Sequence, residues 1–72
     1  MIVKISSTSK CAALLHLGYK ACGFSLTGEV YFEFFLEDDS PLSLIEHAKI
    51  PINVKQYEDL KKLLVKIGFK HE

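Results

Sequence analysis

The sequence contains no arginine, and its charges cancel. Nine lysines stand against nine acidic residues, so the formal net charge at pH 7 is zero. A chain without net positive charge creates no long-range field that would gather phosphate backbones or anionic lipid. Nucleic-acid-binding proteins also depend on the arginine guanidinium for bidentate and stacking contacts. The composition therefore argues against nucleic acid as the main partner.

Long apolar runs and dense cysteines are missing as well. The stretch from Met1 to Ser6 has too few apolar residues for a signal-peptide core, and far too few for a membrane span. We therefore expect a cytoplasmic protein that does not contact a membrane. Cys11 and Cys22 lack the close spacing of a secreted disulfide scaffold, and we expect both to be free, buried thiols.

The composition that is present belongs to a small globular protein. The 72 residues are 49 per cent hydrophobic and 25 per cent charged, and they fit one domain over residues 1–72. A chain this short buries only about 60 per cent of its extended surface, so its stability should be marginal. Self-association or binding to another partner could supply part of the stability that the small core does not provide.

Alternation and capping residues predict a strand, a helix and a hairpin in the first half of the chain. Val3 and Ile5 alternate with polar residues, as in a half-buried strand. The hydroxyl residues that follow can cap a helix over about 9–17, which Gly18 would end. Two strands, over 19–26 and 29–37, are then joined through Thr27 and Gly28 in a tight turn.

Two helices are predicted in the second half. Ser40 is the expected N-cap of a short helix over about 41–49, and residues 50–52 should be extended because of the proline at 51. Asn53 is the expected N-cap of the last helix, with Gln56 completing a capping box. Its apolar stripe is predicted from the helical spacing, and Gly68 should end it with Phe69 packing back. The stripe consists of Tyr57, Leu60, Leu64 and Ile67.

These elements predict an α+β fold, a two-layer sandwich in the order β-α-β-β-α-α. We expect a small three-stranded sheet with a central β-hairpin and with the helices packed on one face. Val30, Phe32, Phe34 and Leu36 alternate along the second hairpin strand and should form its core face. The sequence leaves open where the first strand pairs.

Four passages resemble a small family of bacterial and phage proteins classed only as a domain of unknown function. They are the opening strand, AALLHLGYK from Ala12 to Lys20, VYFEFF from Val30 to Phe35, and NVKQYEDLKKLL from Asn53 to Leu64. The resemblance spans nearly the whole chain, but its motifs are core and capping patterns. It implies a fold and offers no function to carry over.

A second resemblance is to small toxin ribonucleases of double-stranded-RNA-binding type fold. The shared feature is a helix followed by a glycine and a hairpin. In those proteins a glycine-serine-histidine passage opens the second hairpin strand and carries the catalytic histidine, whereas this chain has Thr27-Gly28-Glu29-Val30 there. The ribonuclease activity therefore does not transfer.

No set of residues has the spacing of a metal or catalytic site. Structural zinc ligands usually come in pairs two to five residues apart, and the nearest pair, Cys11 and His16, would point to different sides of a helix. Glu29, Glu33 and Glu37 would project from an open sheet face that does not desolvate them enough for acid–base chemistry. We expect neither an enzyme nor a bound metal or other cofactor. The remaining candidate ligands are Cys22, His47 and His71.

The outer face of the hairpin is the most suggestive surface. A two-residue turn would set Phe24 opposite Tyr31, and Cys22 opposite Glu33, so that Phe24, Tyr31 and Phe35 form an exposed aromatic strip. A three-residue loop would instead move Phe24 and Cys22 to the core face. Exposed aromatic patches commonly mark contact sites. The candidate protein-contact residues are Phe24, Tyr31, Glu33 and Phe35.

Two hypotheses of function follow. The first is a non-enzymatic accessory or regulatory module that binds a protein partner, or a second copy in a homodimer, through this outer face. The alternative is a small nucleic-acid-binding regulator that uses lysines of the last helix, although acidic residues share that helix. These lysines are Lys55, Lys61, Lys62 and Lys66.

Overall fold

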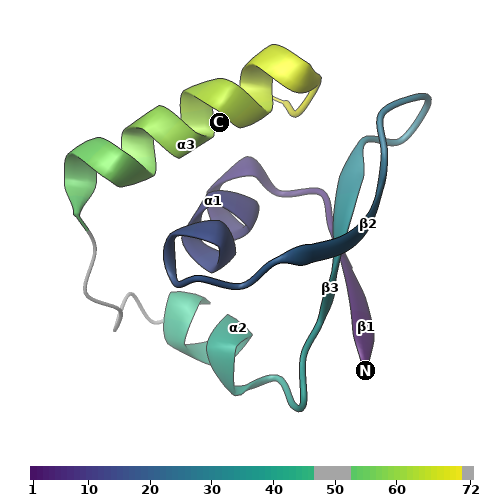
Figure 1. Ribbon diagram of the computed structural model, residues 1–72, viewed down its shortest axis with the longest axis vertical. Coiled ribbons are helices and arrows are strands. Elements are labelled where there is room, and N and C mark those ends of the chain that lie inside the picture. Colours follow the sequence, from purple (N-terminus) through teal and green to yellow (C-terminus); the bar gives the residue numbers. More distant parts are fainter. Residues whose placement is uncertain (47–52, 71–72) are drawn as a thin grey trace.

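The fold is a sheet covered on one side by helices. A computed structural model describes residues 1–46 and 53–70. In Figure 1 all three helices lie on the same side of the sheet, and its other side carries none of them. The expected α+β order is confirmed: β1 (Ile2–Ile5), α1 (Thr8–His16), β2 (Ala21–Ser25), β3 (Tyr31–Phe35), α2 (Ser40–Glu46) and α3 (Val54–Ile67).

The strand order is β1-β3-β2, so the second hairpin strand is the centre of the sheet. Both of its neighbours run antiparallel to it. β1 pairs with β3 without irregularity, from Ile2 opposite Phe35 to Ile5 opposite Phe32. The position of β1, which the sequence left open, is thereby fixed beside β3 and away from β2.

The predicted N-caps of α1 and α3 are confirmed, but the capping box of α3 is incomplete, because the Asn53 N–H donates to His16 Nε2 and not to Gln56. The Ser7 hydroxyl accepts from the Lys10 N–H at the start of α1, and the Asn53 side chain accepts from the Gln56 N–H at the start of α3. At the end of α3, Gly68 takes a φ of 127°, and the Phe69 N–H donates to the Leu64 carbonyl. A positive φ at this position favours glycine.

The start of α2 differs from the prediction by one residue. The Asp39 carbonyl accepts from the Ser43 N–H, so Ser40 is already helical and is not the N-cap. Asp38 Oδ1 accepts instead from the Ser40 N–H at 2.9 Å, which lowers the pKa of the Asp38 carboxyl. The predicted end of this helix, near residue 49, and the predicted extended segment 50–52 lie outside the described residues.

The core lies between the sheet and the helices. Phe34 and Leu36 are buried, while Val30 and Phe32 are half-buried against the same cluster, which confirms the predicted inner face of β3. Ile67 is an exception on the predicted stripe of α3, because it is 44 per cent exposed and is not among the residues packed against this cluster. The buried cluster comprises Ile5, Cys11, Ala12, Leu14, Phe34, Leu36, Leu64 and Phe69.

Polar contacts fasten α1 to the C-terminal part of the chain. The buried Thr8 hydroxyl donates to the Lys70 carbonyl, and the Tyr57 hydroxyl donates to the Ser9 carbonyl at 3.3 Å. At the other end of α1, His16 Nε2 accepts from the Asn53 N–H at 3.2 Å. These bonds hold α1 and α3 against each other on the helix-covered side of the sheet.

Replacing the Thr8 hydroxyl should weaken the fold measurably. Thr8→Val keeps the side-chain shape but leaves the Lys70 carbonyl without this donor, so we expect a loss of about 1–3 kcal/mol in the free energy of unfolding. Urea denaturation followed by circular dichroism measures this loss. The matched control is Thr27→Val on the exposed hairpin tip, which should stay within about 0.5 kcal/mol of wild type. Equal stability of the two variants would contradict the role given to Thr8.

Candidate functional site

The hairpin has two registers, separated by a bulge. Ala21 lies opposite Phe34, as a two-residue turn requires. Nearer the tip, Phe24 lies opposite Phe32 and Ser25 opposite Tyr31, which is the register of a three-residue loop. The irregularity falls between Ala21 and Gly23. The interpretation based on a two-residue turn is therefore wrong at the tip of the hairpin.

This shift removes Phe24 from the predicted aromatic strip. Because Phe24 is opposite Phe32, it lies on the helix side of the sheet, and the two rings meet edge to face at 6.4 Å between centroids. It is nevertheless 67 per cent exposed, so this position on the inner face does not make it a core residue. Cys22, in the bulge, is exposed and not buried as expected.

The open sheet face retains the other three predicted contact residues and gains two from β1. Tyr31, Glu33 and Phe35 alternate on the side of β3 away from the helices. The β1 register sets Ile2 beside Phe35 and Lys4 beside Glu33 on that same side. We use the term open sheet face for Ile2, Lys4, Tyr31, Glu33 and Phe35. The alternation of β1 places Ile2 and Lys4 on the same face, but the sequence could not assign them to this site because the strand that pairs with β1 was not known.

The open sheet face has an apolar end and a polar end. Ile2 and Phe35, which are neighbours, are 62 and 63 per cent exposed. Lys4 Nζ lies 5.0 Å from the centroid of the Tyr31 ring, in a cation–π arrangement. The Glu33 side chain lies over Gly23, where an added Cβ would be only 2.9 Å from Glu33 Oε1. The charged groups are thus held on the β-sheet beside the apolar pair and do not cover it.

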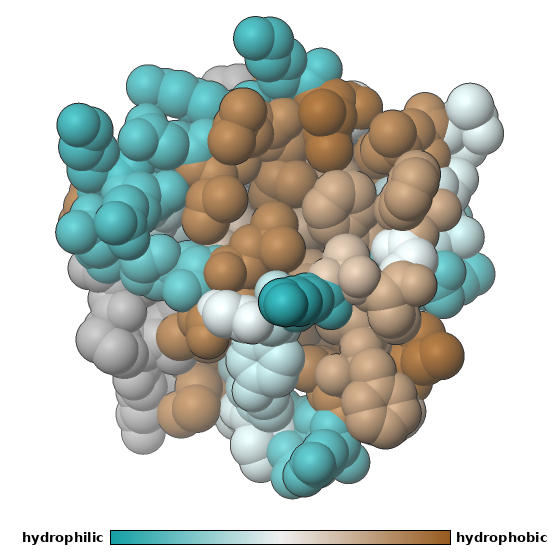
Figure 2. All heavy atoms as spheres, viewed as in Figure 1, coloured by the Kyte–Doolittle hydropathy of each residue, from teal (hydrophilic) through white to brown (hydrophobic). Residues whose placement is uncertain are grey.

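A second apolar area lies on the helix side of the molecule. Figure 2 shows apolar side chains gathered over a broad area from α3 towards the hairpin. Large apolar residues that are exposed on these elements are Leu63 and Ile67 of α3 and Phe24 of the hairpin. A hollow of about 370 Å³ adjoins α3 between the two long helices, lined by Leu15, His16, Gln56, Asp59, Leu60 and Leu63. This area is the main alternative to the open sheet face as a candidate contact surface.

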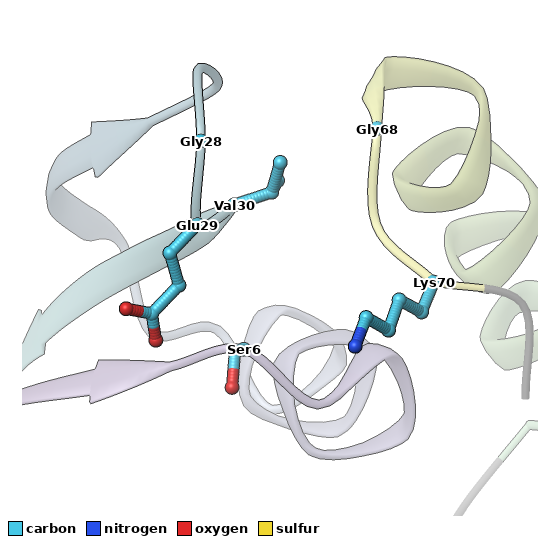
Figure 3. Close-up of a pocket in the computed structure, with 6 residues that line it drawn as sticks. All are labelled: Ser6, Gly28, Glu29, Val30, Gly68 and Lys70. Atoms are coloured by element: carbon cyan, nitrogen blue, oxygen red, sulfur yellow. The ribbon is translucent and has the colours of Figure 1, made fainter.

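A larger hollow lies between the hairpin tip and the C-terminal turn. Its volume is about 490 Å³, and Figure 3 shows the Lys70 side chain reaching into it towards Ser6, whereas the Glu29 side chain points away from Lys70. Both side chains are exposed. Water therefore screens their charges, and the hollow does not provide the desolvation that acid–base chemistry needs. Its remaining lining residues are Ser6, Gly28, Val30 and Gly68.

The described residues offer little for metal or thiol chemistry. Residues 1–46 and 53–70 contain no group of three or more histidine, cysteine or acidic side chains placed to hold a metal ion. His47 and His71 lie outside that part of the chain. Burial raises the pKa of the Cys11 thiol to about 12, so it stays protonated at neutral pH. Cys22 is free and exposed, and its Sγ donates to the Glu33 carbonyl at 3.4 Å.

The lysines of α3 do not form a basic stripe. Lys55, Lys62 and Lys66 are exposed, but Glu58 and Asp59 are exposed on the same helix. Lys61 is half-buried, with Nζ 5.4 Å from the centroid of the Tyr57 ring. The helix therefore presents mixed charge, which is a weak basis for binding a phosphate backbone.

Comparisons of the chain with protein-family models, with curated proteins and with solved structures find no significant match. The resemblances noted in the sequence therefore remain expectations. Within residues 1–46 and 53–70, no helix has the length and apolar character needed to cross a membrane.

The two cysteines should differ sharply in reactivity. Cys22 is exposed and Cys11 is fully buried, so Ellman's reagent should react with one thiol in the native protein and with two in urea. Cys22→Ser should remove the native reaction and leave the reaction in urea. Rapid modification of Cys11 in the native Cys22→Ser variant would show that the helix layer opens readily.

Burial of Cys11 should also make stability fall at alkaline pH. The folded thiol ionises near pH 12, whereas the unfolded one ionises near its ordinary value of 9.0, so the unfolded chain loses this proton first. The contribution is complete below pH 9 and declines as the pH rises towards 12. Between pH 9 and 10, wild type should lose about 1 kcal/mol more than Cys11→Ala in urea denaturation. Parallel pH profiles would contradict this burial effect.

Proposed function

We propose that this protein is a non-enzymatic protein-interaction module whose contact surface is the open sheet face. The single observation that carries the proposal is the exposure of Ile2 and Phe35, which lie side by side on the face turned away from α1, α2 and α3. Antiparallel sheets usually present polar side chains to water on their uncovered face. Two large apolar neighbours at the centre and edge of such a face indicate that another molecule covers them.

The chemistry of this face favours protein as the partner. Its apolar pair is bordered by one basic and one acidic side chain, Lys4 and Glu33, and by the phenol ring of Tyr31. An apolar centre with an aromatic residue and a polar margin is the usual anatomy of a protein–protein interface. A nucleic-acid platform would need basic flanks beside the aromatic residues, and here Lys4 is balanced by Glu33.

Two features of the described residues favour a binding role over a catalytic one. The one cysteine on the buried face of a helix, Cys11, is held as a neutral thiol. The hollow of Figure 3 is lined by exposed charges of opposite sign. Neither arrangement supplies an activated nucleophile or base.

The second hypothesis is nucleic-acid binding through the lysines of α3, of which Lys55, Lys62 and Lys66 are fully exposed. It makes a different prediction about salt, because binding to phosphates weakens steeply as the salt concentration rises. Binding through the apolar pair of the open sheet face should change little over the same range. A salt titration of whatever binds therefore separates the two hypotheses.

Replacing Phe35 should abolish partner binding and leave the fold intact. Phe35→Glu sets a charge at the apolar end of the open sheet face, whereas Phe24→Glu makes the same change at an equally exposed phenylalanine on the helix side. We expect proteins captured by the tagged wild-type chain from its native lysate to be retained by Phe24→Glu. Phe35→Glu should lose them, by at least about tenfold in affinity for the purified partner.

Nuclease treatment and circular dichroism complete this experiment. The captured protein should survive nuclease, and both variants should show the wild-type spectrum. Loss of binding in Phe24→Glu alone would transfer the contact surface to the helix side. Recovery of nucleic acid, with all captured proteins lost after nuclease, would favour the lysines of α3 instead.

A further inference from the structure

The outer edge of β1 has backbone groups that point away from the sheet. The Met1 nitrogen donates to the Leu36 carbonyl at 2.7 Å, and the Leu36 N–H donates to the Met1 carbonyl at 2.8 Å. Residues that exchange two bonds alternate along an antiparallel pair with residues that exchange none. Val3 and Ile5 therefore bond to β3, while the N–H and C=O groups of Ile2 and Lys4 face the open edge.

The opposite edge of the sheet is built differently. β2 carries the bulge between Ala21 and Gly23, and the Glu33 side chain lies over Gly23. A bulge interrupts the regular spacing of backbone donors and acceptors and so protects an edge from pairing. β1 has no such irregularity along its four paired residues. Of the two edges, β1 alone offers a regular template for a further strand.

We infer that β1 pairs antiparallel with β1 of a second copy, around a two-fold axis at Val3. Ile2 then lies opposite Lys4 of the second copy, and Lys4 lies opposite its Ile2. Each of these two residue pairs exchanges two backbone hydrogen bonds, because the outward groups belong to these residues. Val3 faces its own counterpart. The two three-stranded sheets become one continuous sheet of six strands.

Charge selects this register from the alternatives. Centring the pairing on Lys4 would set the two lysines directly opposite each other, which is unfavourable. Centring the pairing on Ile2 would leave Lys4 without an opposite residue in β1 of the second copy, so only the two Ile2 residues would exchange backbone hydrogen bonds. With the axis at Val3, each Lys4 stays beside Glu33 of its own chain and over its own Tyr31 ring. A second copy fits because this edge is complementary to itself, as a two-fold interface requires.

The pairing would also enlarge the contact surface, a consequence that rests on the proposed function. In the combined sheet, one row of side chains across the strands consists of Phe35 and Ile2 of one copy followed by Lys4 and Glu33 of the second. The next row consists of Glu33 and Lys4 of the first copy followed by Ile2 and Phe35 of the second. The two apolar pairs therefore flank the axis on one uncovered face, and a partner could contact both copies together.

Proline at position 2 tests the pairing directly. Because the Ile2 N–H points to the open edge, Ile2→Pro removes a bond to the second copy and no bond to β3. Sedimentation equilibrium should show a wild-type dimer, and the dimer affinity of Ile2→Pro should fall by at least about tenfold. Ile2→Ala keeps the N–H and should remain a dimer. A wild-type monomer at all concentrations, or an Ile2→Pro dimer of unchanged affinity, would overturn the inference.

A disulfide tests the register without depending on the stability of the proline variant. Counterparts at a non-hydrogen-bonded pair have Cα atoms about 4.5 Å apart, within the range of a disulfide. In a Cys22→Ser background, Val3→Cys should therefore form an interchain disulfide under mild oxidation. Ile2→Cys, whose counterpart is diagonal at roughly 7–8 Å, should form it much more slowly. Equal rates, or no cross-link at either position, would exclude the axis at Val3.

Phe35→Glu separates this inference from the proposed function. Phe35 lies on β3, away from the paired edge, so Phe35→Glu should remain a dimer while losing the partner. Ile2→Pro should lose the dimer. If Phe35→Glu dissociates the dimer, the copies meet face to face and the edge pairing is wrong. If Phe35→Glu keeps both the dimer and the partner, the proposed contact face is wrong and the edge pairing stands.

Discussion

The central position of β3 is the constraint on which the rest of the structure depends. Its side chains alternate between the two faces, so the burial of Phe34 under the helices commits Tyr31, Glu33 and Phe35 to the other face. Both neighbouring strands take their registers from β3. The helices then pack where the inner face is apolar, and Phe69 completes that face by meeting Phe32 edge to face at 5.2 Å. The open sheet face is thus a direct consequence of how the core is filled.

The bulge in β2 shows how a shift of one residue redistributes side chains between faces. Ala21 keeps the register that its small side chain suits, opposite the buried Phe34. Beyond the bulge, Phe24 moves to the helix side and joins Phe32, while Gly23 provides the space that Glu33 occupies. The same irregularity makes β2 a poor edge for further pairing. One local feature therefore decides both the composition of the open sheet face and the difference between the two edges.

The two uncovered apolar areas differ in how they are bordered. On the helix side, Leu63 and Ile67 belong to α3, whose other apolar residues pack against the core. The apolar stripe of an amphipathic helix can be wider than the area that the core covers, and this accounts for part of their exposure. On the open sheet face, Ile2 and Phe35 lie on the opposite side of the sheet from the buried cluster that the described residues form. Their apolar area therefore contributes nothing to the core, and this is the observation on which the proposed contact surface rests.

Periodicity and capping in the sequence determined the element types, their order and the inner face of β3, because these depend on local spacing and on residues such as Asn53 and Gly68. Tyr31, Glu33 and Phe35 were predictable on the outer face for the same reason. Only the tertiary structure decided that β1 joins β3, which brings Ile2 and Lys4 to this face, since strand neighbours depend on long-range packing. It also decided the position of Phe24, because a bulge of one residue leaves the alternating pattern of the sequence unchanged and yet reverses the face.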